Sequence, residues 1–127
     1  MSILLLNYAH PLTEEQLGQV SALLGETPEV RFISTQVDRD ISLAQVAGDL
    51  ATATGLLPAE WQTRRLVVNP PSLAPVALAL LAEIHGRCGY FPPILNIRPV
   101  LDALPPRYEV AEIVNLQAVR DTARHRR

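Results

Sequence analysis

Apolar and polar positions follow two different periods along the chain, and their alternation predicts strands separated by helices. Five short apolar segments bounded by polar or turn residues predict strands at 3–8, 29–36, 66–68, 94–98 and 108–114. Apolar residues recur at spacings of three and four from 13 to 25, from 42 to 55 and from 73 to 85, which predicts amphipathic helices. This order predicts one small doubly wound α/β domain, with a mostly parallel sheet and helices on both faces.

The middle of the chain has the pattern of a complete crossover unit. The apolar strand 66–68 is stopped by Pro70 and Pro71, which cannot donate hydrogen bonds to a ladder. Ser72 is expected to cap the next helix, and Pro75 falls in its first turn, where a missing N–H is tolerated. Residues 86–90 then form a loop at the opposite edge of the sheet. Because a helix start beside the carboxyl end of a strand attracts anions, we expect function at that edge.

Polar residues at the helix ends support the other helices. Thr13 and Ser42 are each followed three residues later by glutamine, which is the pattern of a capping box. Gly25 and Gly55 are expected to end these two helices. Asn115 is expected to cap a short C-terminal helix.

Two segments carry less regular patterns. Residues 56–64 predict a linker in which Trp61 packs on the sheet in preference to binding a base. The last strand contains Glu109 and Glu112, and charges inside a strand indicate an edge of the sheet.

Length and composition indicate one globular domain, expected at 1–119, with a basic tail at 120–127. No segment approaches the roughly 18 uninterrupted apolar residues of a membrane span. The apolar run that begins at Ile3 lacks the basic flank of a signal peptide. The single cysteine, Cys88, fits a reducing cytoplasm, and one cysteine with three dispersed histidines predicts neither a metal site nor a cofactor.

The distribution of charge restricts the classes of partner that the protein is expected to bind. All eleven basic residues are arginine, and residues 1–119 carry seven of them against twelve acidic residues, a net charge of −5. Long nucleic acids are bound mainly through many phosphate contacts, so a body this acidic is a poor candidate for that role. A small anionic ligand, held locally, is compatible with this charge.

Polar residues follow three of the predicted strands at the carboxyl edge of the sheet. His10 is the only candidate general acid or base there, and a structural role before Pro11 explains it equally well. A helix cap explains Ser72 better than a nucleophile does, and Arg98 fits either a phosphate contact or an ion pair at the edge. The set comprises Asn7, Tyr8 and His10 after the first strand, Asn69 and Ser72 after the third, and Asn96 and Arg98 in the fourth.

Three short segments resemble those of a known family. They are residues 7–13 (NYAHPLT), residues 68–72 (VNPPS) and residues 89–95 (GYFPPIL) with Arg98-Pro99-Val100. The chain resembles the small ancillary proteins of type III CRISPR systems, which are similar to single CARF domains, that is, Rossmann-like modules that sense cyclic oligoadenylates. The similarity spans most of the chain, but its motifs are short.

The resemblance implies a homodimer or larger assembly that holds cyclic tetra-adenylate across the carboxyl ends of its strands. Adenine edges would contact Asn7 or Asn69, or stack on Tyr8. Helix starts after Thr13 and Ser72 would meet phosphates through backbone N–H groups. The implied ligand-binding set is Asn7, Tyr8, Ala9, His10, Thr13, Asn69, Pro70, Pro71, Ser72, Asn96 and Arg98.

Members of this group either cleave the cyclic messenger or only sequester it. Cleavage by ring nucleases needs no metal, because a ribose 2′-hydroxyl attacks its own phosphate with the help of alignment and one acid or base. His10 would supply that help, but the chain offers no lysine and no evident carboxylate partner for it. We therefore expect a sponge, with a ring nuclease as the alternative. A dimeric protein-interaction module, contacting its partner through the arginine-rich tail, is the second alternative.

Overall fold

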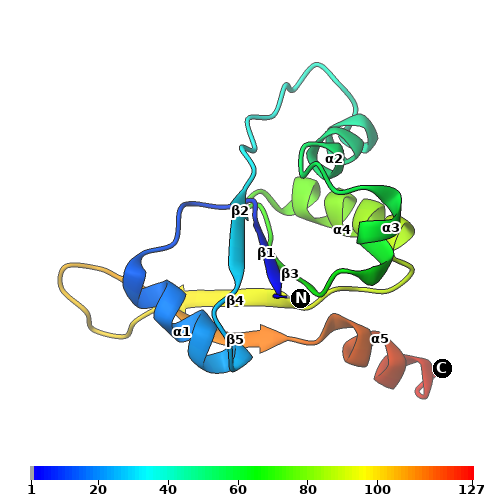
Figure 1. Ribbon diagram of the computed structural model, residues 1–127. Coiled ribbons are helices and arrows are strands. Elements are labelled where there is room, and N and C mark those ends of the chain that lie inside the picture. The colour runs from blue at the N-terminus through cyan, green and yellow to red at the C-terminus, as the bar shows by residue number, and fades with distance from the viewer. Residues whose placement is uncertain (1) are drawn as a thin grey trace.

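The computed structural model describes residues 2–127, which form a five-stranded sheet with the strand order β2-β1-β3-β4-β5 (Figure 1). β1 to β4 run parallel, and β5 pairs with β4 in the antiparallel sense. The strands are β1 (Leu4–Asn7), β2 (Glu29–Phe32), β3 (Leu66–Asn69), β4 (Ile94–Pro99) and β5 (Tyr108–Val114). β1 therefore lies inside the sheet, and β5 forms an edge, as its two glutamates predicted.

Helices cover both faces of the sheet (Figure 1), which confirms the doubly wound α/β fold. One face packs against α1 (Glu14–Leu24), and the other packs against α2 (Leu43–Thr52), α3 (Pro58–Thr63) and α4 (Ala74–Cys88). Alternate residues of β1 separate the two layers, since Leu4 and Leu6 face α4 and Leu5 faces α1. No helix in the described part of the chain is both long and apolar enough to cross a bilayer.

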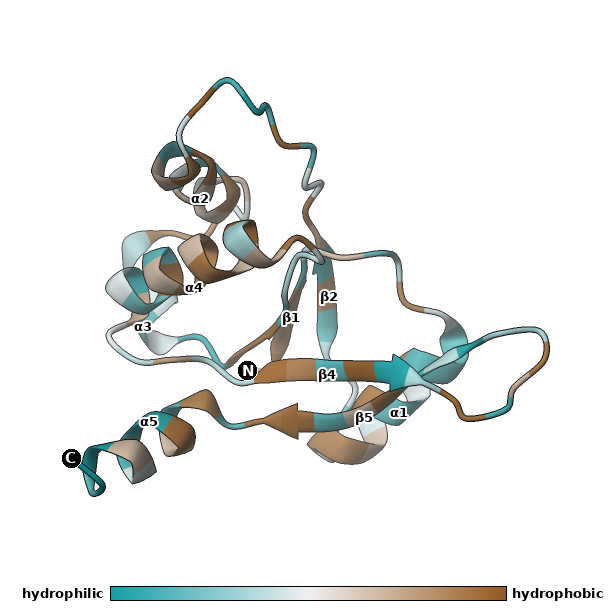
Figure 2. Ribbon diagram, turned by 180° about the vertical axis from the view of Figure 1, so that it is seen from behind, coloured by the Kyte–Doolittle hydropathy of each residue, from teal (hydrophilic) through white to brown (hydrophobic). Residues whose placement is uncertain are grey.

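The last helix, α5 (Leu116–Arg124), extends from the end of β5 and has no buried residue. Seen from behind, its start is hydrophobic and its end hydrophilic (Figure 2). The backbone N–H of Phe91 donates to the side chain of Gln117, which ties α5 to the chain just before β4. Residues 120–124 of the expected tail are therefore helical, and the boundary expected at residue 119 falls inside α5.

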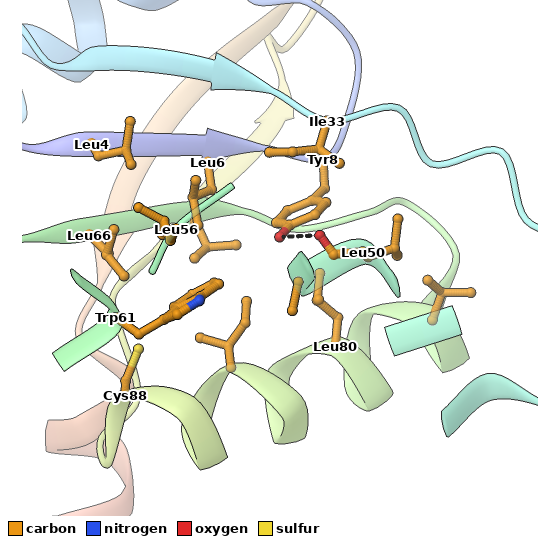
Figure 3. Close-up of a cluster of buried hydrophobic side chains, with 14 of the residues drawn as sticks. Leu4, Leu6, Tyr8, Ile33, Leu50, Leu56, Trp61, Leu66, Leu80 and Cys88 are labelled. Atoms are coloured by element: carbon orange, nitrogen blue, oxygen red, sulfur yellow. Dashed lines mark hydrogen bonds between the residues drawn. The ribbon is translucent and has the colours of Figure 1, made fainter. Parts of the chain in front are cut away.

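The larger core layer lies between the sheet and α2, α3 and α4 (Figure 3). Trp61 lies in it with 1% of its surface exposed, which confirms that its ring packs on the sheet. The predicted linker that contains it forms α3, because Pro58 occupies the first turn, where its fixed φ suits a helix. The Arg87 guanidinium lies 5.9 Å from the Trp61 ring centroid and closes one side of this layer.

Most predicted helix ends are confirmed. The Thr13 hydroxyl accepts a hydrogen bond from the Gln16 backbone, and the Gln16 side chain accepts one from the Thr13 backbone. The Ser42 hydroxyl accepts from the Gln45 backbone, although without the reciprocal bond of a capping box. Gly25 ends α1 with a φ of 78°, and the Asn115 side chain caps α5.

Three boundaries differ from expectation. Pro75 is in the first turn as predicted, but α4 begins only at Ala74, so Leu73 and not Ser72 is the boundary residue, and no side chain caps this helix. α4 also continues through the glycine at 86 to Cys88 and ends at Gly89, whose φ of 84° favours glycine. Gly55 follows the end of α2 by three residues.

The second strand is shorter than predicted, because it stops at Phe32. Residues 33–42 then form a long connection to α2 at the carboxyl edge (Figure 1).

Candidate ligand-binding site at the carboxyl edge

The site lies where the chain reverses its direction across the sheet. After β1 the chain crosses to β2 on one side, and after β3 it crosses to β4 on the other side. In parallel α/β sheets, the carboxyl ends of two such neighbouring strands diverge and leave a crevice. The segments after β1 and β3 are 8–13 and 70–73, so they border this crevice.

A hollow of about 510 Å³ opens at this point, and we call it the first hollow. Seven of the residues expected in the ligand-binding set line it, from three segments far apart in the sequence. They are Ala9, His10, Thr13, Asn69, Pro70, Ser72 and Asn96.

Two buried amides fix the floor of the first hollow. The Asn69 Nδ2 donates to the Asn7 Oδ1 at 3.0 Å, and both side chains are more than nine-tenths buried. The Asn7 Oδ1 also accepts from the backbone N–H of Ala9, and its Nδ2 donates to the carbonyl of His10. Asn7 is thus occupied in shaping the loop after β1. Asn69, in contrast, lines the hollow, and its Oδ1 accepts no hydrogen bond from any residue between 2 and 127.

Two further hollows continue along the same edge. The second hollow, about 380 Å³, shares Ala9, His10, Pro11 and Ser72 with the first. The third hollow, about 470 Å³, shares Thr35 and Ser72 with the second, and Pro71 lines it as well. Ser72 therefore contributes to all three hollows, which form one trough along the carboxyl edge. Since it does not cap α4, its hydroxyl is not needed by the helix.

Tyr8 is among the residues that border the second hollow, but its ring does not face the trough, contrary to the stacking role that the resemblance implied. The ring is fully buried in the larger core layer, where its hydroxyl donates to the carbonyl of Leu50 (Figure 3). This burial raises the pKa of the Tyr8 phenol far above its usual range, with a smaller opposing effect of the Arg87 charge. The alternation of side chains along an extended segment decides this, since Tyr8 points to the same face as Leu4 and Leu6.

Arg98 is also placed away from the trough. It forms an ion pair with Glu109 on the neighbouring strand, with 3.2 Å between its Nε and the carboxylate. Asn96 lines the first hollow, while its Nδ2 donates to Glu112 at 2.9 Å. The ion pair explains Arg98 without a ligand.

His10 is exposed and lines both the first and the second hollow. Its carbonyl is held by Asn7, but its imidazole makes no hydrogen bond or ion pair with the residues of the described chain. An imidazole without a carboxylate partner has no fixed tautomer and no fixed orientation. No group of three potential metal ligands gathers within residues 2–127.

Several lining residues carry no sequence signal for a site. The sequence identifies Gln16 only as a capping residue. Its Nε2 also donates to the Tyr108 carbonyl at 3.1 Å, and both residues line the first hollow. Tyr108 belongs to the edge strand, is exposed, and lines that hollow. Thr35 and Arg39 come from the long β2–α2 connection. These residues meet only because the loops after different strands converge at one edge.

The trough is lined by residues that carry amide and hydroxyl groups, by the exposed Tyr108, by Asp38 and Arg39, and by the backbone of two loops. Such a surface can hold a polar ligand larger than a single small molecule. No protein-family model, no curated protein and no solved structure matches the chain.

Proposed function

We propose that this protein binds cyclic tetra-adenylate, the second messenger of type III CRISPR defence, at the carboxyl edge and sequesters it without efficient cleavage. One observation carries the proposal: seven residues selected from the sequence line a single hollow at the switch point of the sheet. The edges of an adenine base can exchange hydrogen bonds with amides such as those of Asn69 and Asn96. The face of the base can stack on an aromatic ring such as that of Tyr108. The motifs that resemble the CRISPR ancillary proteins supply the identity of the ligand.

Self-association is part of this proposal. A cyclic ligand with internal symmetry suits a two-fold interface, which presents the same patch twice. The chain carries an apolar hollow of about 160 Å³ between α4, β4 and the start of α5, and among its lining residues Leu78 is exposed. Val119, on the next turn of α5, is exposed as well. A second copy that covers this face would remove these side chains from water.

Sequestration is favoured over turnover by the surroundings of His10. Cleavage by 2′-hydroxyl attack is accelerated when a positioned base takes the proton and a cation stabilises the phosphate. The His10 imidazole has no carboxylate partner in the described chain, and no arginine lines either of the two hollows that His10 borders. The alternative of a ring nuclease rests on the position of His10, which lines two adjoining hollows of the trough.

The test is incubation of the full chain, in excess, with labelled cyclic tetra-adenylate, followed by native and denaturing separation of the same sample. A ligand that is retarded in the native separation and intact in the denaturing one supports a sponge. Linear products that end in a cyclic phosphate would replace it with the ring nuclease. No shift and no product, with cyclic hexa-adenylate equally inert, would refute the proposed function.

A His10→Ala variant separates the two outcomes further. A nuclease that uses His10 loses turnover and keeps binding, whereas a sponge has no turnover to lose. A Leu78→Glu variant tests the assembly, because a carboxylate on the apolar face is expected to shift the protein towards the monomer in analytical ultracentrifugation. Deletion of residues 120–127 should leave ligand binding intact, whereas a protein-interaction module would lose its partner.

A further inference from the structure

The arginines of residues 2–119 fall into two groups. Those in the first group form ion pairs with a glutamate; they are Arg31, Arg64, Arg65, Arg87 and Arg98. Arg39 and Arg107 form the second group and make no ion pair with any described residue. Both lie in connections at the carboxyl edge, between β2 and α2 and between β4 and β5. Of these two arginines, Arg39 lines the trough.

Arg39 lines the third hollow, whose wall is otherwise mostly apolar. The Ser72 hydroxyl and the Thr35 side chain lie where this hollow meets the second one. The apolar lining residues are Val37, Ile41, Leu43, Pro71, Leu73, Pro75 and Val76. The charged lining residues are Arg39 and Asp38. An apolar wall, two hydroxyls and a guanidinium match the chemistry of a nucleotide, because a base packs on apolar groups and a phosphate takes the arginine fork.

The neighbouring acidic residues, Asp38 and Asp40, form no ion pair with Arg39. Asp38 lines the third hollow too, but its Oδ1 accepts a hydrogen bond from the backbone N–H of Asp40 at 2.8 Å, which holds it in the turn of the loop. Neither carboxylate lies within ion-pair distance of the guanidinium. Both acids weaken the local positive potential, so the guanidinium serves as a contact for one phosphate and not as a general anion attractor.

We propose that the third hollow is a second nucleotide subsite of the trough, in which Arg39 binds a phosphate and the apolar wall contacts the adenine. This inference rests on the proposed function, because it extends the same ligand from the first hollow past Ser72. The ligand therefore spans at least two nucleotides on each copy of the protein, and adenosine monophosphate binds much more weakly than the cyclic tetramer.

The test compares the affinity of the full chain and its variants for labelled cyclic tetra-adenylate. A charge-assisted hydrogen bond contributes roughly 1.5–3 kcal/mol, so Arg39→Ala is expected to weaken binding about tenfold to a hundredfold. Arg124→Ala is the matched control, since it removes the same charge from an exposed arginine of α5 that has no ion pair in the described chain and lies at the amino edge. Arg39→Lys should restore part of the loss, because it keeps the charge without the fork.

A second pair of variants probes the apolar wall. Leu73 and Leu23 are 53% and 50% exposed, so the same change to glutamate carries a similar folding risk at both positions. Leu73→Glu adds a second carboxylate to the third hollow, where Asp38 and Arg39 are now the only charged residues, and should weaken binding at least tenfold by repelling the phosphate. Leu23→Glu, near the end of α1 at the amino edge, should bind as the wild type does.

The outcomes separate this inference from the function on which it rests. If the wild type binds no cyclic oligoadenylate, the proposed function fails and the inference fails with it. If the wild type binds and Arg39→Ala and Leu73→Glu bind equally well, the inference alone is overturned. Loss of affinity in these two variants, with the two controls unchanged and all four folded by circular dichroism, supports it.

Discussion

The buried amide pair under the first hollow offers a sharp test of how the site is held. Asn7→Ala removes an amide whose Oδ1 accepts from Asn69 Nδ2 and from the Ala9 backbone, and whose Nδ2 donates to the His10 carbonyl. These three hydrogen bonds join β1, β3 and the loop that carries His10. The substitution leaves each partner without its bond in a region closed to most water.

The expected magnitude follows from these contacts. A net contribution of about 1 kcal/mol for each hydrogen bond gives a loss of about 3 kcal/mol in the free energy of unfolding. For a domain whose stability is typically 5–15 kcal/mol, such a loss is a large fraction of the total. The midpoint of urea unfolding should fall by about 1–3 M for ordinary m-values.

The assay uses the fluorescence of Trp61, the single tryptophan, which moves from the core into water on unfolding. Asn96→Ala is the control, because that side chain is exposed and makes one hydrogen bond, to Glu112. We expect the control to change stability by less than about 0.5 kcal/mol. An Asn7→Ala variant within that same limit would refute the argument that the amide network holds the loop.

Three further predictions concern groups whose surroundings are explicit. Tyr8→Phe loses the bond to the Leu50 carbonyl, so it should cost about 1 kcal/mol in urea unfolding and leave ligand affinity unchanged; a large loss of affinity would give the ring a role in binding. Thr13→Ala removes the cap of α1 and should cost about 1 kcal/mol, whereas an unchanged unfolding midpoint would contradict the cap. Burial raises the pKa of the Cys88 thiol to about 11, so its rate of alkylation by iodoacetamide should keep rising with pH up to about 11 in the folded chain and level off near the ordinary value of about 9 in urea. Since the unfolded chain then loses the proton first, stability should fall as pH rises through this window; alkylation at equal rates in both states would contradict the burial.

Local signals along the chain were enough to predict the fold class and most element boundaries. The capping residues Thr13, Ser42 and Asn115 mark helix starts. In each case the side-chain oxygen of the cap accepts a hydrogen bond from the backbone N–H three residues later, which has no partner inside the helix. Trp61 was correctly expected in the core on the strength of its size. The carboxyl edge was also predictable, since parallel strands joined by crossovers end on the same side.

Other features depended on which loops meet in space. Alternation along the first strand puts Tyr8 on the same face as Leu4 and Leu6, but only the packing of α2 against that face shows that its ring is buried. Gln16, Tyr108 and Arg39 join the trough only when segments distant in sequence converge, and no local pattern marks that convergence.

The sequence by itself determined the alternation of strands and helices, apart from α3, and also the apolar layers and the polar residues that follow the strands. Only the tertiary structure decided which of those polar groups are consumed internally, as Asn7 and Arg98 are, and which face an open hollow, as Asn69 and Ser72 do. The physical reason is that periodicity and capping are short-range effects within one turn or one strand. The partners of a polar side chain, in contrast, are fixed by contacts between segments far apart in the chain.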